Sequence, residues 1–521
     1  MNASLADGAP LDVLIVGAGI SGIGAACHLS RELPQKSYAI LEARDKLGGT
    51  WDLFRYPGVR SDSDVPTYAY AFKPWKSRKT FAGGDEILAY LREAAGEHGV
   101  DRKIRYGCKA IAADWDSASA LWRVTVLSAD AGSETTVRCR WLFVATGYYD
   151  YERGHRPHFP DEETFRGPIV HPQVWPEGFD AKGKRIAVIG SGATAVTLVP
   201  ALAEAGAQVT QIQRTPSYIL PFPSDDAIAN ALRRVLPETT AYAIARRKNI
   251  LLQQWLYAFF QRYPKAARRF LRWTNRRLLP KGYPVDLHFN PPYDPWDQRL
   301  CIAPDGDFLK AIRIGRVSIV TGGIERFTPG GVRMNSGEEI AADVIVPATG
   351  LAVTLLRGMR LSLDGVPVYL PERMVFKGTM LDGVPNLCFV FGYVNASWTL
   401  RADLISRFFC RLLKALDARG EAVCVVQRPE GETGDRPLFD FRPGYIERAL
   451  SDLPRQGLGS PWVMSSSYAL DELLLTREPI IDPAMRLKAA PSTPAWRAGW
   501  HEGGANKERA TRKGSPEGSW P

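Results

Sequence analysis

The sequence predicts an α/β protein with two Rossmann-like dinucleotide-binding domains and a helical insertion. A pattern of apolar strand, glycine turn and helix occurs twice, over residues 11–33 and again over residues 184–205. Between residues 224 and 283, a basic and aromatic segment interrupts the alternation of strands and helices. At 521 residues the chain exceeds what one hydrophobic core can organise, so two or three domains are expected.

The composition is that of a globular protein without structural metal or disulfides. Hydrophobic residues make up 45% of the chain, which is ample for several cores. Seven widely spaced cysteines contain no Cys-x-x-Cys pair, so we expect no disulfide framework, zinc site or dithiol redox centre. We expect no export signal and no transmembrane helix, because no apolar stretch reaches spanning length. A cytoplasmic location follows.

The net charge of +10 is concentrated in one part of the chain. Residues 224 to 280 contain twelve Lys or Arg against three acids, and no nucleic-acid-binding motif accompanies them. The positive charge is therefore expected on the surface of the insertion, and a nucleic-acid partner is not expected.

The first dinucleotide site begins with the strand-forming residues 11–16. Gly17 permits a tight turn, Gly19 lets the backbone approach a pyrophosphate, and Gly22 allows the following helix to pack closely on the strand. A second strand then delivers Glu42, whose carboxylate can accept a hydrogen bond from a ribose 2′-OH. This acid favours FAD or NAD over a cofactor with a 2′-phosphate.

A glycine- and aromatic-rich stretch follows directly. Gly49 can bring the backbone against the cofactor, while Trp51 and Tyr56 supply flat apolar walls. By composition alone, Asp62 and Asp64 are typical of solvated turn residues.

The second dinucleotide site repeats the pattern with a different specificity signal. Gly190 and Gly192 form the turn, and Thr194 lies at the start of the next helix. Arg214 stands after the next strand, where the first site has its acid, followed by Thr215. A guanidinium can hold a 2′-phosphate through charge-assisted hydrogen bonds, so NADPH is favoured over NADH.

The segment between the two sites has the spacing F-x-G-x-x-x-H-x-x-x-W-P, formed by Phe165, Gly167, His171, Trp175 and Pro176. Its prolines favour a stiff, non-helical strap, and the simplest alternative is an ordinary proline-rich connector. The spacing resembles the fingerprint of the Baeyer-Villiger monooxygenases, which are class B flavoprotein monooxygenases. The stretch ending at Asp62 resembles a second signature of that family, G-G-x-W-x-x-x-x-Y-P-G-x-x-x-D.

A third motif, Pro-Trp-x-Gln-Arg-Leu, is similar to the ethionamide-monooxygenase-like branch of this family. The resemblance implies that Arg299 is catalytic and that Asp62 lies beside the flavin as its partner. Gln298 stands where better-studied branches have a lysine that contacts the NADPH 2′-phosphate. Arg214 and Thr215 would then carry more of the NADPH preference, and the selectivity could be weaker.

The insertion itself predicts helices near residues 227–236, 241–261 and 263–279. A basic amphipathic helix can lie on a membrane surface, so peripheral membrane contact is one interpretation. The favoured interpretation is an aromatic face packed inward with a solvated basic back. The aromatic residues concerned are Trp255, Tyr257, Phe259, Phe260, Phe270 and Trp273.

These patterns give a domain plan. We expect a discontinuous FAD-binding domain of residues 1–150 and 345–488, and an NADPH-binding domain of residues 151–344. Residues 489–521 are expected to be a disordered basic tail. Ser397 is expected to cap a helix whose N-terminus faces the flavin, as in similar flavoproteins.

The resemblance implies an FAD- and NADPH-dependent monooxygenase that converts ketones to esters or lactones with O₂ through a C4a-peroxyflavin, and that also oxidises organosulfides. Arg299 would stabilise the negative charge, Asp62 would orient Arg299, and His171 would act in linker geometry and domain movement. Two alternatives stay open: a flavin monooxygenase acting on sulfur or nitrogen, and a catalytically silent flavoprotein. Trp175-Pro176 favours ketones. The physiological substrate and the oligomeric state are left open.

Overall fold

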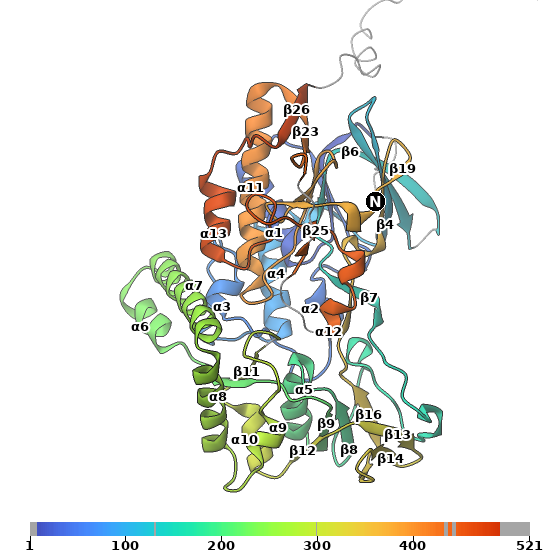
Figure 1. The fold of residues 1–521 in the computed structure, drawn as a ribbon. Helices are drawn as coiled ribbons and strands as arrows, with labels where there is room; N and C mark the ends of the chain where they lie inside the picture. The colour runs from blue at the N-terminus through green and yellow to red at the C-terminus, as the bar shows by residue number, and fades with distance from the viewer. Residues whose placement is uncertain (1–7, 130–131, 299, 432–435, 440–443, 490–521) are drawn as a thin grey trace, which may run out of the picture.

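The computed structural model describes residues 8–129, 132–298, 300–431, 436–439 and 444–489. They form two α/β units, one above the other in Figure 1, and a group of helices that projects to one side. The predicted α/β class with two dinucleotide-binding folds is confirmed.

The first unit is built on a sheet of nine strands in the described residues, ordered β19-β18-β4-β5-β6-β1-β2-β3, with β22 beside the end of β6. β1 lies between β2 and β6 and is parallel to both, which places the first glycine turn at the carboxyl edge of the sheet. Helices α1, α4 and α11 pack together on this unit. The strands are β1 (Leu11–Val16), β2 (Tyr38–Leu41), β3 (Ile104–Arg105), β4 (Cys108–Asp116), β5 (Leu121–Ser128), β6 (Glu134–Val144), β18 (Arg360–Leu363), β19 (Val366–Pro367) and β22 (Leu387–Phe389). The helices are α1 (Ile20–Glu32), α4 (Gly84–Glu97) and α11 (Trp398–Arg419).

The second unit is a four-stranded parallel sheet, ordered β12-β9-β8-β16, with α5 and α10 beside it. Its elements are β8 (Arg185–Ile189), α5 (Ala193–Glu204), β9 (Gln208–Gln213), α10 (Asp307–Arg313), β12 (Val317–Thr321) and β16 (Val344–Pro347). β16 pairs with β8 along its whole length, so Val344–Pro347 are part of this second sheet.

Two chain crossings join the units. β7 (Tyr149–Gly154) runs antiparallel to β17 (Leu351–Val353), so the outgoing and returning chains are paired. The linker between the two glycine turns also pairs with β16, since Val170 donates to the Ile345 carbonyl (2.9 Å) and Ile345 donates to the Pro168 carbonyl (3.1 Å).

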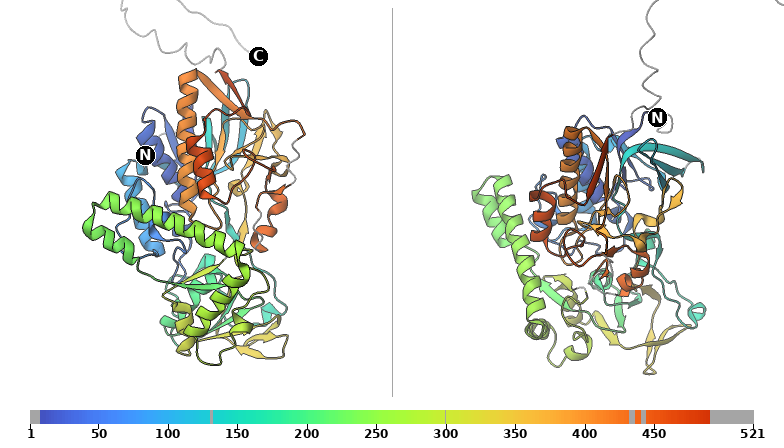
Figure 2. Two further views of the ribbon diagram at one scale, coloured as in Figure 1. Left: turned by 60° about the vertical axis from the view of Figure 1, so that its left-hand side comes forward. Right: turned by 45° about the horizontal axis from the view of Figure 1, so that its top comes forward.

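The insertion forms the three predicted helices, α6 (Ala227–Val235), α7 (Glu238–Arg262) and α8 (Pro264–Leu278), followed by the short α9 (Val285–His288). The inner face of α7 is anchored to the first unit, where Arg246 donates to the carbonyls of Pro66 and Ala69 (2.8 Å each). The favoured interpretation of an inward aromatic face is wrong for Trp255, Phe270 and Trp273, which are exposed; Phe260 is buried. Figure 2 shows α6 and part of α7 projecting to one side, while α8 lies beside β10 (Ile219–Phe222) and α10.

The remaining elements are short. The strands are β10 (Ile219–Phe222), β11 (Cys301–Pro304), β13 (Ile324–Thr328), β14 (Gly331–Met334), β15 (Glu339–Ala341), β20 (Val375–Phe376), β21 (Met380–Leu381), β23 (Glu421–Val426), β24 (Arg436–Pro437), β25 (Arg455–Gln456) and β26 (Met485–Ala489). The helices are α2 (Thr50–Leu53), α3 (Val65–Tyr68), α12 (Gly444–Glu447) and α13 (Tyr468–Glu472). Across the described ranges, no helix has the length and apolar character needed to cross a bilayer.

Candidate active site

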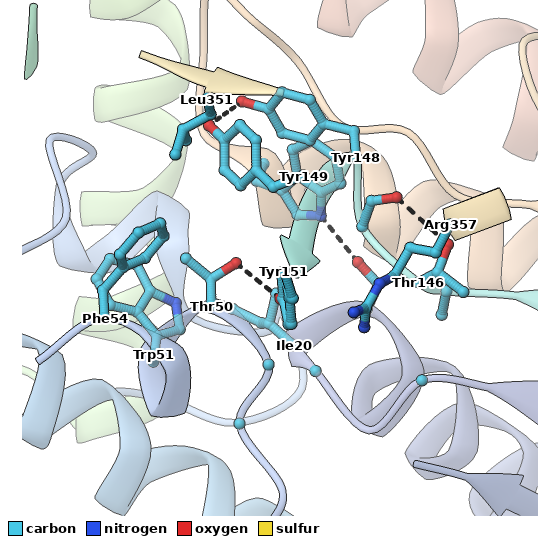
Figure 3. A pocket seen from close by; sticks show the side chains of 18 of the residues that line it. Ile20, Thr50, Trp51, Phe54, Thr146, Tyr148, Tyr149, Tyr151, Leu351 and Arg357 are labelled. Atoms are coloured by element: carbon cyan, nitrogen blue, oxygen red, sulfur yellow. Dashed lines mark hydrogen bonds between the residues drawn. The ribbon is translucent and has the colours of Figure 1, made fainter. Parts of the chain in front are cut away.

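An elongated cavity starts at the carboxyl ends of β1 and β2 and extends to the N-terminus of α5 in the second unit. Figure 3 shows its aromatic wall, with Trp51 and Phe54 facing Tyr149 and Tyr151. Among the residues predicted for the first dinucleotide site, it is lined by Gly17, Gly19, Glu42, Gly49, Trp51 and Asp62. We call this the first cavity.

The glycines of the first cavity are required by the close approach of the backbone. At Gly17, where φ is +106°, a Cβ atom would lie 2.6 Å from the Ala145 carbonyl oxygen. At Gly49, where φ is +57°, a Cβ atom would lie 3.0 Å from the Cα atom of Gly19. A side chain at either position would collide with residues that line the cavity, so glycine keeps the narrow cradle that fits a dinucleotide diphosphate. Gly22 does not line the cavity; a Cβ atom there would lie 1.9 Å from the Gly17 carbonyl oxygen, so glycine allows α1 to pack on the turn.

Glu42 is held rigidly at the end of β2. Its side chain is buried, and its two oxygens accept hydrogen bonds from the backbone N–H groups of Ala18 (2.8 Å) and Arg44 (3.0 Å). Burial raises the pKa of the Glu42 carboxyl, while the two backbone donors oppose that shift. These two bonds fix the position of the carboxylate on the cavity wall.

The aromatic wall is fixed by hydrogen bonds. Trp51 Nε1 donates to the Tyr68 hydroxyl (2.6 Å), and burial raises the pKa of Tyr68 far above its usual range. Asp64 is not the solvated turn residue that composition suggested. It is buried, and it accepts hydrogen bonds from Thr67 N–H (3.0 Å) and from Asn249 of α7 (2.8 Å). Asp64 therefore joins the insertion to the loop that carries Asp62.

Tyr151 and Arg357 line the first cavity, although the sequence motifs did not predict them as site residues. The Arg357 guanidinium lies 4.0 Å from the ring centroid of Tyr151, and the Tyr151 hydroxyl is 3.2 Å from Thr50 Oγ1. Arg357 adopts a left-handed conformation with φ of +48° in the turn after β17. Tyr151 follows the predicted Ala-Thr-Gly strand end and could have been suspected, whereas nothing local in the sequence marks Arg357.

The second glycine turn opens toward the same cavity. Position 190 requires glycine for two reasons. Its φ is +141°, and a Cβ atom would lie 2.3 Å from the Ala348 carbonyl oxygen. At Gly192 a Cβ atom would meet no described heavy atom within 4 Å, which leaves room for a ligand to approach the backbone. Thr194 lines the first cavity, whereas Arg214 is exposed beyond it at the end of β9. The Thr215 carbonyl accepts a hydrogen bond from Ser191 (2.8 Å).

The predicted linker residues lie outside the cavities. They are Phe165, Gly167, His171, Trp175 and Pro176. No cavity described here includes any of them. Phe165 is buried against the second sheet, and Trp175 meets Phe179 with ring centroids 5.0 Å apart.

His171 caps the short 3-10 turn of residues 172–174 within the linker. Its Nδ1 accepts a hydrogen bond from the Gln173 N–H (3.2 Å), and burial lowers the pKa of the imidazole. The ring lies against Gly154 at the end of β7, where a Cβ atom would be 2.1 Å from His171 Cε1. His171 therefore wedges the linker against the crossing between the units.

A second, largely apolar cavity lies between the first unit and the insertion. It shares Asp62, Ser63, Val394 and Ala396 with the first cavity, so the two cavities meet at Asp62. Its apolar walls come from β10, α6, α7, the loop before β11, β11 itself and one residue before α4. The apolar residues concerned are Phe81, Leu220, Phe222, Ile228, Leu252, Leu256, Phe260, Trp296, Leu300 and Ile302.

Two predicted residues belong to this junction. Ser397 lines the second cavity and occupies the N-cap position of α11, although its side chain makes no capping hydrogen bond. Its buried hydroxyl has no hydrogen-bond partner among the residues that the structure describes. Arg299 lies outside the described residues, while Trp296 and Leu300 on either side of it line the second cavity.

Comparison with known proteins agrees with this arrangement. Residues 11–239 match the family described as pyridine nucleotide-disulphide oxidoreductase. The FAD-containing monooxygenase EthA of Mycobacterium tuberculosis (strain ATCC 25618 / H37Rv) is 50% identical over 483 residues, covering 92% of this chain and 98% of EthA. EthA of Mycolicibacterium smegmatis is 47% identical over 461 residues, covering 88% of this chain and 93% of that protein.

Solved structures show the same fold. An oxidised steroid monooxygenase bound to NADP has a TM-score of 0.72 at 24% identity, covering 92% of this chain and all of that chain. A cyclohexanone monooxygenase bound to ε-caprolactone has a TM-score of 0.71 at 20% identity with the same coverage. With two relatives at nearly half identity over almost their full length, the chain belongs to the family of FAD-containing monooxygenases, as its sequence motifs predicted.

Proposed function

We propose that this flavoprotein is an NADPH-dependent Baeyer-Villiger monooxygenase. In the proposed reaction a ketone, O₂, NADPH and a proton give an ester or lactone, NADP⁺ and water. One oxygen atom enters the carbon–carbonyl bond and the other leaves as water. The observation that carries the proposal is the meeting of a cofactor cavity and an apolar cavity at Asp62.

FAD would occupy the first cavity. The backbone at Gly17 and Gly19 and the start of α1 would receive its diphosphate, and Glu42 would accept a hydrogen bond from its ribose. Gly49 would allow close approach, and Trp51 would form a flat wall. When bound, the flavin accepts hydride from the nicotinamide and activates O₂.

NADPH would bind at the second glycine turn. Gly192 leaves open space at the N-terminus of α5, and Thr194 reaches the first cavity, so the nicotinamide end would face the flavin. The exposed Arg214, with Thr215 beside it, would hold the 2′-phosphate at the end of β9. Gln298 is half-buried, and its uncharged side chain would not attract the 2′-phosphate as a lysine would.

The substrate would occupy the second cavity. Its walls are apolar side chains from β10, α6 and α7, which favour a ketone with a large hydrocarbon body. Its reacting carbonyl would lie near Asp62, where the cavities meet.

We assign charge stabilisation to Arg299. A guanidinium stays protonated at every physiological pH, and it stabilises negative charge on the substrate oxygen most strongly where water is excluded. Asp62 would orient that guanidinium by a carboxylate hydrogen bond. His171, wedged against Gly154, would hold the linker during relative movement of the units.

The domain assignment is part of the proposal. The FAD-binding domain would comprise residues 1–150 with the chain beyond Pro347, and the NADPH-binding domain would comprise the second sheet, including β16. The expected tail, residues 489–521, lies outside the described residues except for Ala489, the last residue of β26.

The test is product analysis with purified enzyme, NADPH and a panel of linear, cyclic and aryl ketones and one organosulfide. Ester or lactone formed in proportion to NADPH consumed would support the proposal. Sulfoxide without any ester would assign the chain to heteroatom oxygenation. Hydrogen peroxide as the sole oxygen product with every compound would contradict oxygenation altogether.

A further inference from the structure

The helices of the insertion carry an exposed apolar surface on the side away from the first unit. We call this surface the outer face and define it by Ile244, Leu251 and Trp255 of α7 and Phe270 and Trp273 of α8. Trp255 is 60% exposed and Trp273 is 53% exposed. Half of the large apolar side chains that the described residues leave exposed belong to α6, α7, α8 or the junction residue Tyr263. Such a concentration marks an interaction surface.

The outer face follows helical spacing on both helices. On α7, positions 244, 251 and 255 lie opposite the buried Ala245 and Asn249. On α8, positions 270 and 273 lie opposite the buried Leu271. The exposed apolar side chains of the outer face thus lie on each helix away from the residues that it buries.

Basic side chains flank the apolar stripe of α8. Lys265, Arg269 and Arg276 are exposed and follow one another at helical spacing beside it. The Arg277 guanidinium lies 4.9 Å from the ring centroid of Trp273. Tryptophan and tyrosine next to Lys and Arg are typical of helices that lie in the interface of an anionic bilayer.

The apolar cavity reaches the surface on this insertion. Ile228 of α6 and Leu252 of α7 line the second cavity, yet they are 59% and 38% exposed. These two residues therefore form a rim through which the cavity communicates with the exterior beside the outer face.

We propose that the outer face docks on an anionic phospholipid surface, and that the second cavity takes apolar substrate from that surface through the rim at Ile228 and Leu252. The docking is independent of the enzymatic reaction, whereas the intake of substrate rests on the proposed function. The positive surplus of the insertion is complementary to an anionic bilayer. A second copy of the chain would present the same positive charge, so self-association through this face is disfavoured.

The docking is tested by sedimentation of the full-length FAD-loaded enzyme with vesicles of phosphatidylcholine alone and of phosphatidylcholine mixed with an equal amount of phosphatidylglycerol. The enzyme is expected to sediment with the anionic vesicles and to be released by salt. A Trp255→Ser/Trp273→Ser variant and a Lys265→Glu/Arg269→Glu variant are each expected to lose about tenfold or more in partitioning.

The matched control is Val366→Ser/Tyr369→Ser, which removes two side chains that are 67% and 61% exposed in the first unit. It is expected to sediment like the wild type. The proposal would be overturned if the enzyme bound neutral and anionic vesicles equally or bound neither. It would also be overturned if the control variant lost as much vesicle binding as the outer-face variants. Concentration-dependent self-association in light scattering, abolished by the same outer-face variants, would assign the face to a second copy and also overturn it.

Substrate intake is measured separately with a ketone dissolved in the anionic vesicles and with a small water-soluble ketone. The Trp255→Ser/Trp273→Ser variant is expected to lose turnover of the first and keep that of the second. If the variant kept turnover of both ketones, the proposed intake of substrate from the bilayer would be overturned. Absence of turnover of both ketones by the wild type would refute the proposed function and leave the docking result intact.

Discussion

Replacing Gly167 by alanine should loosen the linker from the second sheet. A Cβ atom at this position would lie 2.3 Å from the Asp343 carbonyl oxygen and 2.7 Å from the Phe165 ring. The backbone oxygen belongs to the residue before β16, so the linker must move away from that strand. Two hydrogen bonds join the linker to β16, those between Val170 and Ile345 and between Ile345 and Pro168.

The expected destabilisation follows from those contacts. Each hydrogen bond contributes about 0.5–1.5 kcal/mol and a steric clash costs about 1–3 kcal/mol, so the free energy of unfolding should fall by about 2–6 kcal/mol. Thermal unfolding of the FAD-loaded enzyme measures it. Gly96→Ala in α4 is the matched control, because its Cβ atom would meet no described heavy atom within 4 Å. An unchanged unfolding midpoint for Gly167→Ala would refute the steric account of the fingerprint.

Three further predictions concern other parts of the molecule. Arg214→Ser should raise the KM for NADPH about tenfold, through loss of charge-assisted bonds to the 2′-phosphate, and leave that for NADH unchanged in steady-state kinetics; an equal rise for both would refute the assignment. His28 is buried and bonded to Asp403 (2.9 Å), and although burial alone lowers the pKa of His28, hydrogen bonds to Asp403 and Glu32 raise it. The pair therefore stabilises the fold fully below about pH 6.5, and this stability is lost as pH rises through the raised pKa, so denaturant unfolding of His28→Ala should lack that pH dependence. Leu256→Trp should fill the second cavity and lower kcat/KM for bulky ketones, whereas Leu251→Trp on the exposed side of α7 should not; equal effects would argue against the cavity as the substrate site.

Features set by local sequence were predictable. The two glycine turns and Glu42 lie at fixed distances from a strand end, so spacing alone located them. The helices of the insertion were placed to within three residues by their apolar periodicity.

Features set by distant contacts were not predictable. Arg357 reaches Tyr151 because β17 pairs with β7, a strand from a distant part of the chain. Asp64 was taken for a turn residue because its partner Asn249 lies on the insertion. The exposure of Trp255 depends on which side of α7 packs against the first unit. Arg246 fixes that side by donating hydrogen bonds to the carbonyls of Pro66 in α3 and of Ala69, which follows α3.

The most direct test of the proposed function is product analysis of Arg299→Ala beside the wild type, with one bulky ketone that the wild type converts. The account predicts that the variant keeps its FAD and oxidises NADPH but releases hydrogen peroxide in place of ester, because Arg299 no longer stabilises the negative charge that oxygen transfer requires. Ester formation by Arg299→Ala at a rate near that of the wild type would contradict the account.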